Sequence, residues 1–337
     1  MPVSVGLVAT PEASASSLFG LFDTLMAAGR DWEFLVSGAT ADPVFDVKVV
    51  GPSLEPFQCG SGMRIAPDVT FGAEPHFEIV IVPGLTLSPH ERISPDNHPG
   101  LAWIKSLDPA KTRTTSACTG AVYLAEAGLL NGVEATTHWA WEDLFVREYP
   151  GVRLRTDRGL CFADADKGAV TSGGTTGWQE LALFLIAHYG DTQRAARAAK
   201  IWLMADRGEL QAPYTSMIRS MPHDDTAIQV AQGWIADNYG MENPVKAMVQ
   251  QAGLPPTTFA RRFKRATGKS PQDYVLAVRI EEARQLLETT TAPVAEIGEE
   301  VGYVDTPSFR RVFKRKTGIS PAEHRKMFGQ ARFQRYS

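Results

Sequence analysis

Nine residues of this chain occur twice, and seven of the nine are identical in the two copies. FKRATGKSP occupies residues 263–271, and FKRKTGISP occupies residues 313–321. A repeat of this length and fidelity predicts two copies of one folding unit. The second half of the chain is therefore expected to use the same local structure twice.

The residues around the repeat predict a helix with two different faces. Phe259 and Phe263 stand four positions apart, as do Phe309 and Phe313, so each pair places two large rings on one side of a helix. Basic residues fall on another side, and a short helix ending at a glycine precedes each copy. This order of helix, glycine turn and basic helix is typical of a helix-turn-helix unit.

The end of each repeat predicts where the next helix begins. Thr-Gly-x-Ser-Pro stops one helix at its glycine and starts another, with Ser270 or Ser320 as the N-cap and proline in the first turn. Asp273 and Glu323 follow three residues later, where a carboxylate suits the positive end of a helix. A long helix over about 271–288 is expected to join the two copies.

Charge separates the two parts of the chain. The net charge is −4, but residues 1–222 carry 17 Lys and Arg against 25 Asp and Glu, whereas residues 223–337 carry 17 against 13. The basic residues cluster at 261–265 and 310–316, as on a surface that faces phosphates. A solvated helix face is the alternative reading of one such run.

Composition sets the broad class. With 337 residues, 44% hydrophobic and 21% charged, the chain is long enough for two globular domains. No apolar run reaches the roughly 18 residues of a membrane helix, and the first residues lack a signal-peptide pattern. The three cysteines suggest neither a disulfide framework nor a zinc site. We expect a cytoplasmic protein with reduced thiols, no metal and no cofactor.

The first half alternates strand and helix patterns. Residues 3–9, 17–29 and 32–38 are interpreted as strand, helix and strand, and FEIVIVPG at 77–84 as a strand buried on both faces. Residues 113–130 place a strand, a sharp turn and a helix in succession. These elements predict an α/β domain with a mainly parallel sheet.

The domain boundaries follow from these patterns. We expect a first domain over 1–208, a linker over 209–223 that contains two prolines and has no periodicity, an all-α domain over 224–328, and a tail over 329–337.

A cysteine stands at the sharp turn of the first half, in TSACTGA at 115–121. Such a turn projects the Cys118 side chain above the sheet edge, toward backbone amides and the positive end of a helix. A thiol in that position tends to have a lowered pKa. The alternative is that Cys118 is a small residue in a crowded bend, where Gly120 allows close packing.

The all-α part resembles the AraC/XylS family of bacterial transcriptional regulators. The matching positions are Leu254, Phe259, Arg261, Phe263, Thr267, Gly268, Ser270, Pro271, Tyr274, Ala295, Ile297, Gly302, Tyr303, Ser308, Phe309, Arg311, Phe313, Lys314, Gly318, Ser320 and Pro321. The resemblance implies that the second helix of each unit enters the major groove of DNA.

By this resemblance, twelve residues are expected to face DNA: Thr257, Thr258, Ala260, Arg261, Lys264, Arg265, Thr306, Pro307, Arg310, Arg311, Lys314 and Arg315. Arg261 and Arg311 could each contact a guanine edge, whereas lysines more often meet phosphate. Pro307 cannot donate a hydrogen bond to a base, so the second unit is expected to read less sequence than the first.

Residues 3–190 resemble the class I glutamine amidotransferase-like fold in its DJ-1/PfpI branch. The resemblance rests on IVPG at 81–84, ACTGAVYLAEAGLLNG at 117–132, ATTHW at 135–139 and VTSGGTTG at 170–177. It implies a flavodoxin-like, doubly wound parallel sheet. Cys118 and His138 match the elbow cysteine of that fold and the histidine near it.

Departures from the catalytic pattern of that fold favour a binding pocket over an enzyme. Thr119 follows the cysteine where the protease-like branch has histidine, no glutamate stands two residues after His138, and Ser17 stands where DJ-1-like members carry a glutamate. A Cys-His pair without an orienting carboxylate is a weak nucleophile system. The expected pocket residues are Gly84, Cys118, Thr119, His138 and Trp139. Trp139 or Trp141 could hold a cationic ligand, and ordinary core packing is the alternative role for either residue.

Together these features predict a ligand-responsive transcriptional regulator. Its expected partners are double-stranded operator DNA, a small polar metabolite such as an amino acid or quaternary amine, and a second copy bound through the first domain. RNA polymerase is a further candidate, as for an activator. Two alternatives stay open: a thiol hydrolase or amidotransferase that uses Cys118 and His138, and a redox sensor that uses Cys118.

Overall fold

A computed structural model divides the chain into two compact units, Met1–Gln211 and Ala212–Ser337, and every strand among the described residues lies in the first of them. The structure describes residues 1–39, 41–73, 76–94, 98–163, 168–204, 211–214 and 223–330. No helix in these ranges is long and apolar enough to cross a membrane. Most of the linker expected at 209–223, and the tail beyond residue 330, lie outside the described residues.

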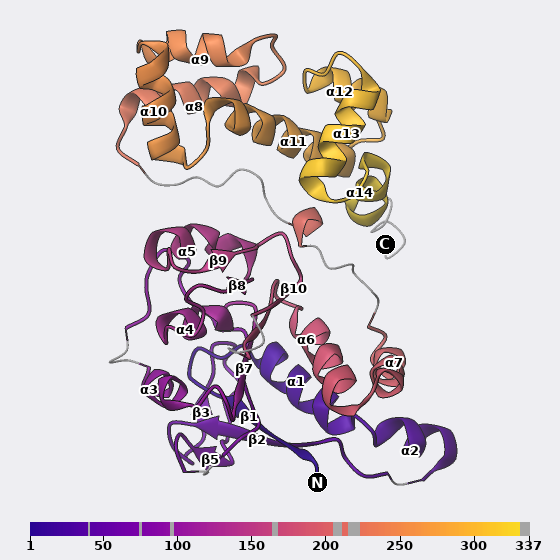
Figure 1. The fold of residues 1–337 in the computed structure, drawn as a ribbon. Coiled ribbons are helices and arrows are strands. Elements are labelled where there is room, and N and C mark those ends of the chain that lie inside the picture. The colour runs from indigo at the N-terminus through magenta and orange to yellow at the C-terminus, as the bar shows by residue number, and fades with distance from the viewer. Residues whose placement is uncertain are drawn as a thin grey trace. The chain divides into compact units, whose positions relative to one another are not determined.

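A seven-stranded sheet forms the centre of the first unit, in the order β10-β11-β7-β6-β1-β2-β5 (Figure 1). All neighbouring strands are parallel except β10, which is antiparallel to β11. The strands are β1 (Val3–Val8), β2 (Phe45–Gly51), β5 (Val69–Thr70), β6 (Ile79–Val82), β7 (Arg113–Ala117), β10 (Leu160–Phe162) and β11 (Val170–Ser172).

Helices cover both faces of this sheet, with α1 and α6 on one face and α3 and α4 on the other (Figure 1). All four residues of β6 are buried, as its continuous apolar sequence predicted. The α/β, doubly wound architecture is thereby confirmed. The helices are α1 (Ala15–Ala27), α2 (Asp31–Ser37), α3 (Pro99–Ser106), α4 (Gly120–Glu126), α5 (Glu142–Glu148), α6 (Trp178–Leu185), extended by a π-turn (Ile186–Gly190), and α7 (Thr192–Ile201).

The strand predicted at 32–38 is wrong, because these residues form helix α2. None of its side chains is buried, whereas a strand inside this sheet would be covered on both faces. Trp32 lies 5.6 Å below the guanidinium of Arg197 in α7, and Glu33 pairs with the same arginine at 2.6 Å. The strand that pairs with β1 is β2, which begins at Phe45.

The strand order creates a topological switch point at the carboxyl ends of β1 and β6. β2 lies on one side of β1 and β6 on the other. The order in which the chain adds strands across the sheet therefore reverses between β1 and β6. Loops that leave β1 and β6 meet there: the Ser14 amide donates to the Gly84 carbonyl at 2.7 Å, and Ala13 bridges Leu85. Open α/β sheets bind ligands at such a switch point.

Short elements complete the first unit: β3 (Phe57–Gln58), β4 (Arg64–Ile65), β8 (Glu134–Ala135), β9 (Arg153–Leu154) and the 3-10 helix η2 (Trp139–Trp141).

All regular elements in the described part of the second unit are helices, as the sequence predicted. They are η4 (Ala212–Tyr214), α8 (Thr226–Asn238), α9 (Pro244–Ala252), α10 (Pro256–Thr267), α11 (Pro271–Thr289), α12 (Val294–Glu300), α13 (Thr306–Thr317) and α14 (Pro321–Phe328). Figure 1 shows α11 running from the group of α8, α9 and α10 to the group of α12, α13 and α14. Each group buries an apolar cluster of its own, and Tyr239 packs against both clusters.

The predicted turns and caps of the repeat are present. Gly253 and Gly302 have φ of 62° and 85°, in the left-handed region that favours glycine. Ser270 Oγ accepts from the Asp273 amide at 3.1 Å, and Ser320 Oγ accepts from the Glu323 amide at 3.3 Å. The second cap is reciprocal, since the Ser320 amide donates to Glu323 at 2.7 Å.

Candidate nucleic-acid interface and candidate effector site

A phenylalanine pair holds the second helix of each helix-turn-helix unit, α10 or α13, which is called the recognition helix below. Phe259 and Phe263 are fully buried with ring centroids 5.2 Å apart, and Phe309 and Phe313 are fully buried at 5.7 Å. Tyr274 of α11 meets the Phe263 ring at 5.2 Å. Because one face of α10 and of α13 is fixed in a core, the opposite face of each helix must be presented to solvent.

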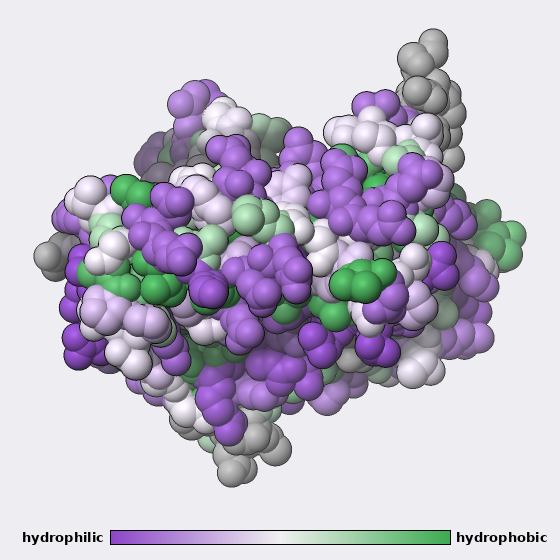
Figure 2. Space-filling model, turned by 90° about the horizontal axis from the view of Figure 1, so that it is seen from above, coloured by the Kyte–Doolittle hydropathy of each residue, from purple (hydrophilic) through white to green (hydrophobic). Residues whose placement is uncertain are grey.

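The residues expected to face DNA lie on that opposite face. Ten of the twelve are exposed, and Thr258 and Thr306 are half-buried. The exposed cations are Arg261, Lys264 and Arg265 on α10, and Arg310, Arg311, Lys314 and Arg315 on α13. Figure 2 views the molecule from above and shows mostly hydrophilic residues on that side, with scattered hydrophobic ones among them.

One cation of the basic run has a different role. Arg262 donates two hydrogen bonds to Asp225, from Nε at 2.9 Å and from Nη2 at 2.7 Å. Asp225 is also the N-cap of α8, and the guanidinium keeps the pKa of this carboxyl below its usual value. Val312 takes the corresponding position of the second copy. Arg262 therefore joins α10 to α8, while Arg261, Lys264 and Arg265 remain exposed.

The repeated threonine is explained by the structure. Thr267 Oγ1 donates to the Phe263 carbonyl at 2.8 Å and accepts from the Lys269 amide at 3.3 Å. Thr317 makes the same pair of bonds, at 2.9 Å to Phe313 and 3.4 Å from Ile319. This hydroxyl satisfies backbone groups at the end of the recognition helix and at the start of the next turn. The sequence offered the identical threonines as a signal, but not this reason.

Cys118 stands on a strained elbow between β7 and α4. Its φ is +55°, and its amide donates to the Ser172 carbonyl at 2.7 Å. A Cβ atom at Gly120 would lie 2.4 Å from the Val82 carbonyl oxygen, so only glycine allows α4 to start this close to β6. The elbow predicted from the sequence is present, and α4 starts from it close to the end of β6.

The thiol itself differs from the expectation of a lowered pKa. Cys118 is buried, and burial raises its pKa to about 11 because the thiolate loses its solvation. Hydrogen bonds involving Thr119 and Thr175 favour the thiolate but offset only part of this effect. At neutral pH the sulfur is therefore protonated and a poor nucleophile.

Of the expected pocket residues, Gly84 lies beside Cys118 and the Thr119 side chain points elsewhere. The Gly84 amide donates to Ser17 Oγ at 2.9 Å, and a Cβ atom at Gly84 would lie 3.5 Å from the Cys118 Cβ and 3.6 Å from Ser17. Thr119 turns to the loop after β6, where its Oγ1 lies 2.6 Å from both the amide nitrogen and the carbonyl oxygen of Leu85. Ser17, Gly84 and Cys118 thus form one cluster.

His138 lies at the start of η2 between two indoles. Its Nδ1 accepts from the Ala140 amide at 3.2 Å, and its ring centroid lies 5.2 Å from that of Trp139 and 5.3 Å from that of Trp141. The preceding residue, Thr137, donates from Oγ1 to the Cys118 carbonyl at 3.0 Å. The structure therefore connects the histidine segment to the cysteine elbow through Thr137.

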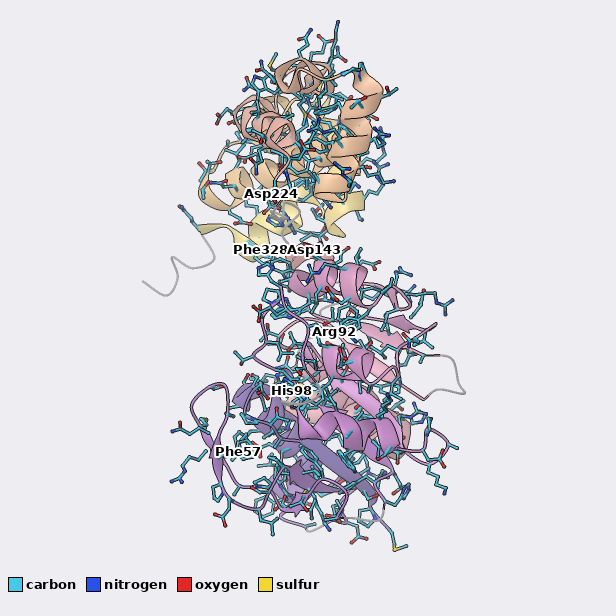
Figure 3. All side chains as sticks on the ribbon, turned by 90° about the vertical axis from the view of Figure 1, so that its left-hand side faces the viewer. Phe57, Arg92, His98, Asp143, Asp224 and Phe328 are labelled. Carbon is cyan, nitrogen blue, oxygen red and sulfur yellow. The ribbon has the colours of Figure 1, made fainter. Side chains whose placement is uncertain are left out.

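A half-buried acid, Glu12, was missed by the sequence reasoning. Glu12, in the loop after β1, has its Oε2 3.8 Å from Nδ1 of His98, and the same nitrogen lies 3.1 Å from the Tyr123 hydroxyl (Figure 3 labels His98). Oε2 has no solvent contact and no hydrogen-bond partner among the described residues. Finding it required the strand order, because a single acid after a strand carries no signal by itself.

Gln211 was expected in the linker, but it is 5% exposed and packs into the first unit. Its Nε2 lies within 3.0 Å of Thr136 Oγ1 and of the carbonyls of Thr137 and Arg158. A Cβ atom at Gly173 would lie 1.8 Å from this nitrogen, so the glycine makes room for the amide. Among the described residues, no three His, Cys, Asp or Glu side chains gather in a way that could hold a metal ion.

Family models match both units. The DJ-1/PfpI family model matches residues 24–188, and a helix-turn-helix domain model matches residues 248–327.

Curated relatives include two regulators and one enzyme. The HTH-type transcriptional regulator CdhR of Pseudomonas aeruginosa is 27% identical over 237 residues, which are 66% of this chain and 66% of that protein. GbdR of the same species, also an HTH-type transcriptional regulator, is 24% identical over 78% of this chain and 70% of its own. Isonitrile hydratase of Pseudomonas putida is 30% identical over 146 residues, 43% of this chain and 56% of the enzyme.

Solved structures share the fold of the first unit. A putative transcriptional regulator protein from Vibrio parahaemolyticus has a TM-score of 0.50 at 20% identity, and covers 60% of this chain and 99% of that one. A ThiJ/PfpI family protein from Pseudomonas syringae has a TM-score of 0.50 at 21% identity, and covers 75% of this chain and 92% of its own.

Proposed function

The chain joins a DJ-1/PfpI domain to an AraC-type helix-turn-helix domain, and on this premise we propose that it is a sequence-specific, DNA-binding transcriptional regulator. One observation carries the proposal. Two recognition helices, α10 and α13, each bury the same phenylalanine pair and expose a row of cations, and one helix connects them. Cations on this face would meet phosphates and base edges of duplex DNA.

The connector sets the expected geometry of the DNA site. α11 has 19 residues, so it spans about 28 Å at roughly 1.5 Å per residue. With the width of each helix-turn-helix unit added, the recognition helices could lie about 34 Å apart. This distance is one turn of B-DNA. One chain would then contact two successive major grooves on the same face of the duplex.

Selection of binding sites from random DNA tests this proposal. The full chain, incubated with a pool of random 30-base-pair duplexes, should enrich sites that contain two short elements with centres about 10 base pairs apart. A double variant, Arg261→Ala with Arg311→Ala, is the control and should enrich no sequence. Enrichment of nothing by the wild-type protein would contradict the proposal.

We further propose that the first unit binds a small polar metabolite and catalyses no reaction. Ser17 stands beside Cys118 where an orienting carboxylate would be needed, and the buried thiol is protonated at neutral pH. The Glu12 carboxylate near the switch point and the two indoles beside His138 favour a ligand with a positively charged group.

Thermal unfolding of the full chain tests for this ligand. Amino acids and quaternary amines are added singly, and one of them should raise the melting temperature of the wild-type protein, since a ligand that binds only the folded state stabilises it. Glu12→Gln keeps the size of the side chain and removes its charge, so this variant should lose the response to a cationic ligand. A response that is the same in Glu12→Gln would remove Glu12 from the site.

An enzyme is the second candidate function, because 146 residues of this chain are 30% identical to isonitrile hydratase. A reaction at Cys118 would need the thiolate, which burial disfavours. Wild-type protein and Cys118→Ser are compared with an isonitrile and with glutamine as substrates. Turnover by the wild type that is lost in the variant would replace the binding proposal by the enzyme.

The assembly is proposed to be a cytoplasmic homodimer formed through the first unit, which activates transcription together with RNA polymerase. Three consecutive apolar side chains of α2, Phe34, Leu35 and Val36, are each more than 60% exposed, as expected of a surface that another molecule covers. Light scattering of the wild-type protein and of Leu35→Glu should give a dimer and a monomer, respectively. A monomeric wild type would contradict the dimer.

A further inference from the structure

Arg279 stands on α11 at the border between the two helix-turn-helix units. The residue before it, Val278, belongs to the apolar cluster of the first helix-turn-helix unit. The residue after it, Ile280, belongs to the cluster of the second helix-turn-helix unit. Arg279 itself is half-buried. Its side chain is therefore placed where the two units meet.

The guanidinium holds backbone from both units. Its Nε donates to the Tyr239 carbonyl at 2.8 Å and its Nη2 to the Met241 carbonyl at 2.8 Å, both in the turn between α8 and α9. Its Nη1 donates to the Gly302 carbonyl at 3.1 Å, in the turn between α12 and α13. The planar fork of an arginine donates to the three carbonyls from three separate nitrogens, whereas a lysine ammonium donates from a single atom.

The same two turns also touch each other. A Cβ atom at Gly240 would lie 2.8 Å from the Glu300 carbonyl oxygen, and one at Gly302 would lie 2.7 Å from the Gly240 carbonyl oxygen. Both distances are too short for a carbon atom. The backbones of the two helix-turn-helix units therefore come into direct contact at Gly240 and Gly302, beside Arg279.

Next to this contact, a groove separates the two helix-turn-helix units. It has a volume of about 440 Å³ and is lined by α9, α11 and α13, with Lys246, Val275 and Arg315 among its residues. Side chains do not fill this space. The orientation of one helix-turn-helix unit relative to the other is thus fixed by α11, by Tyr239, which packs against both apolar clusters, and by the turn contact that Arg279 holds.

The position of each turn links this contact to DNA binding. The first turn leads into α9 and α10, and the second leads directly into α13, so fixing one turn against the other fixes the two recognition helices. We propose that Arg279 is the positioning residue that sets the spacing between the two DNA elements that this protein accepts. The inference rests on the proposed DNA-binding function and adds a residue that selects the spacing.

The required accuracy follows from the geometry of DNA. Inserting one base pair between two elements moves them apart by about 3.4 Å and rotates one against the other by about 35°. Two helix-turn-helix units in a fixed orientation cannot adjust to both the displacement and the rotation, so one of them should lose its specific contacts with DNA. Two units that can rotate about α11 should adjust to part of both changes.

Two variants perturb the contact by different routes. Arg279→Met removes the three hydrogen bonds and keeps an apolar stem of similar length. Gly240→Ala keeps Arg279 but adds a Cβ that must push the Glu300 carbonyl away, and Gly240 is not among the glycines with positive φ. Lys264→Ala is the matched control, because its exposed side chain lies on α10, away from the turns.

The experiment measures affinity of the full chain by fluorescence anisotropy on the selected site, with no insertion and with one or two base pairs inserted between the elements. For the wild-type protein and for Lys264→Ala, an insertion should weaken binding at least about tenfold, although Lys264→Ala binds every probe more weakly. For Arg279→Met and Gly240→Ala the same insertion should weaken binding only about two- to threefold. Arg279→Lys should lie between these limits.

The outcomes separate this inference from a merely structural role. If Arg279 only stabilised the fold, Arg279→Met would lower affinity for all probes by one factor and keep the tenfold discrimination, which would overturn the proposal. Should Arg279→Met fail to fold, Gly240→Ala decides, and unchanged discrimination in that variant overturns the proposal as well. No specific binding by the wild type would overturn the proposed function and this inference with it.

Discussion

Three neighbouring cations of α10 should respond differently to the same substitution. Arg261 and Lys264 are exposed, whereas Arg262 is bound to Asp225 through two hydrogen bonds. We expect Arg261→Ala to lose sequence preference, Lys264→Ala to weaken binding to any DNA, and Arg262→Ala to destabilise the contact between α10 and α8 with little effect on DNA affinity.

The magnitudes follow from the contacts that each side chain can make. A bidentate arginine–guanine pair contributes about 1–3 kcal/mol of discrimination, so Arg261→Ala should lose about 5- to 150-fold on the selected site and far less on random DNA. A phosphate contact contributes about 0.9 to the slope of log affinity against log salt, so the advantage of the wild type over Lys264→Ala should shrink about three- to fourfold between 50 and 200 mM salt.

The assay is an anisotropy titration of the three variants on the selected site and on a scrambled duplex at two salt concentrations. Hydrogen exchange at the start of α8 reports separately on the loss of the Arg262–Asp225 pair. Equal losses on specific and scrambled DNA for Arg261→Ala and Lys264→Ala would refute the division of roles, and so would a large loss of DNA affinity in Arg262→Ala with exchange unchanged.

Three further outcomes are expected. Because burial raises the pKa of Cys118 to about 11, its alkylation by iodoacetamide should be slow at pH 7 and should still accelerate between pH 9 and 10. Peptide mass spectrometry measures the rate of this alkylation. Fast labelling with a plateau near pH 7 would instead support the enzyme or redox alternative. Burial also lowers the pKa of His324 below its unfolded value near 6.5, so the unfolded chain binds the proton more readily, and α11 to α14 should lose stability as pH falls from about 7 toward 5. Hydrogen exchange at pH 7 and 5.5 checks this, and His324→Gln should remove the difference; an equal pH response in that variant would assign it to other groups. Gln211→Leu removes three hydrogen bonds and should speed exchange at residues 136–138 and 173–177 while α10 and α13 stay unchanged; the same rates as in the wild type would mean that Gln211 does not hold these loops.

Much of the second unit could be predicted because its determinants are local. The spacing of Phe259 and Phe263, the glycine turn at 253 and the cap at Ser270 each act over four residues or fewer, and the structure contains all three. Local rules failed at 32–38, where an apolar run was interpreted as a strand. That segment became a surface helix because β2 takes the place beside β1, which is decided by packing across the sheet.

The site in the first unit was predictable only in part. The elbow at Cys118 was visible as a strand that runs into a helix through a small residue, and its neighbour Gly84 was visible at the end of a buried strand. The raised pKa of the thiol and the Glu12 carboxylate near His98 were not, because burial and a switch point arise only once strands distant in sequence lie side by side.

The sequence by itself determined that one helical unit is used twice, which faces of its helices are apolar or basic, and where they begin and end, since these follow from periodicity and capping within a few residues. Tertiary structure decided how the two copies are held. Arg279 could have been a solvated charge on the connector, but folding brings the carbonyls of Tyr239, Met241 and Gly302 to its guanidinium from 40, 38 and 23 residues away. Contacts across such separations depend on how the helices pack, and no local pattern encodes them.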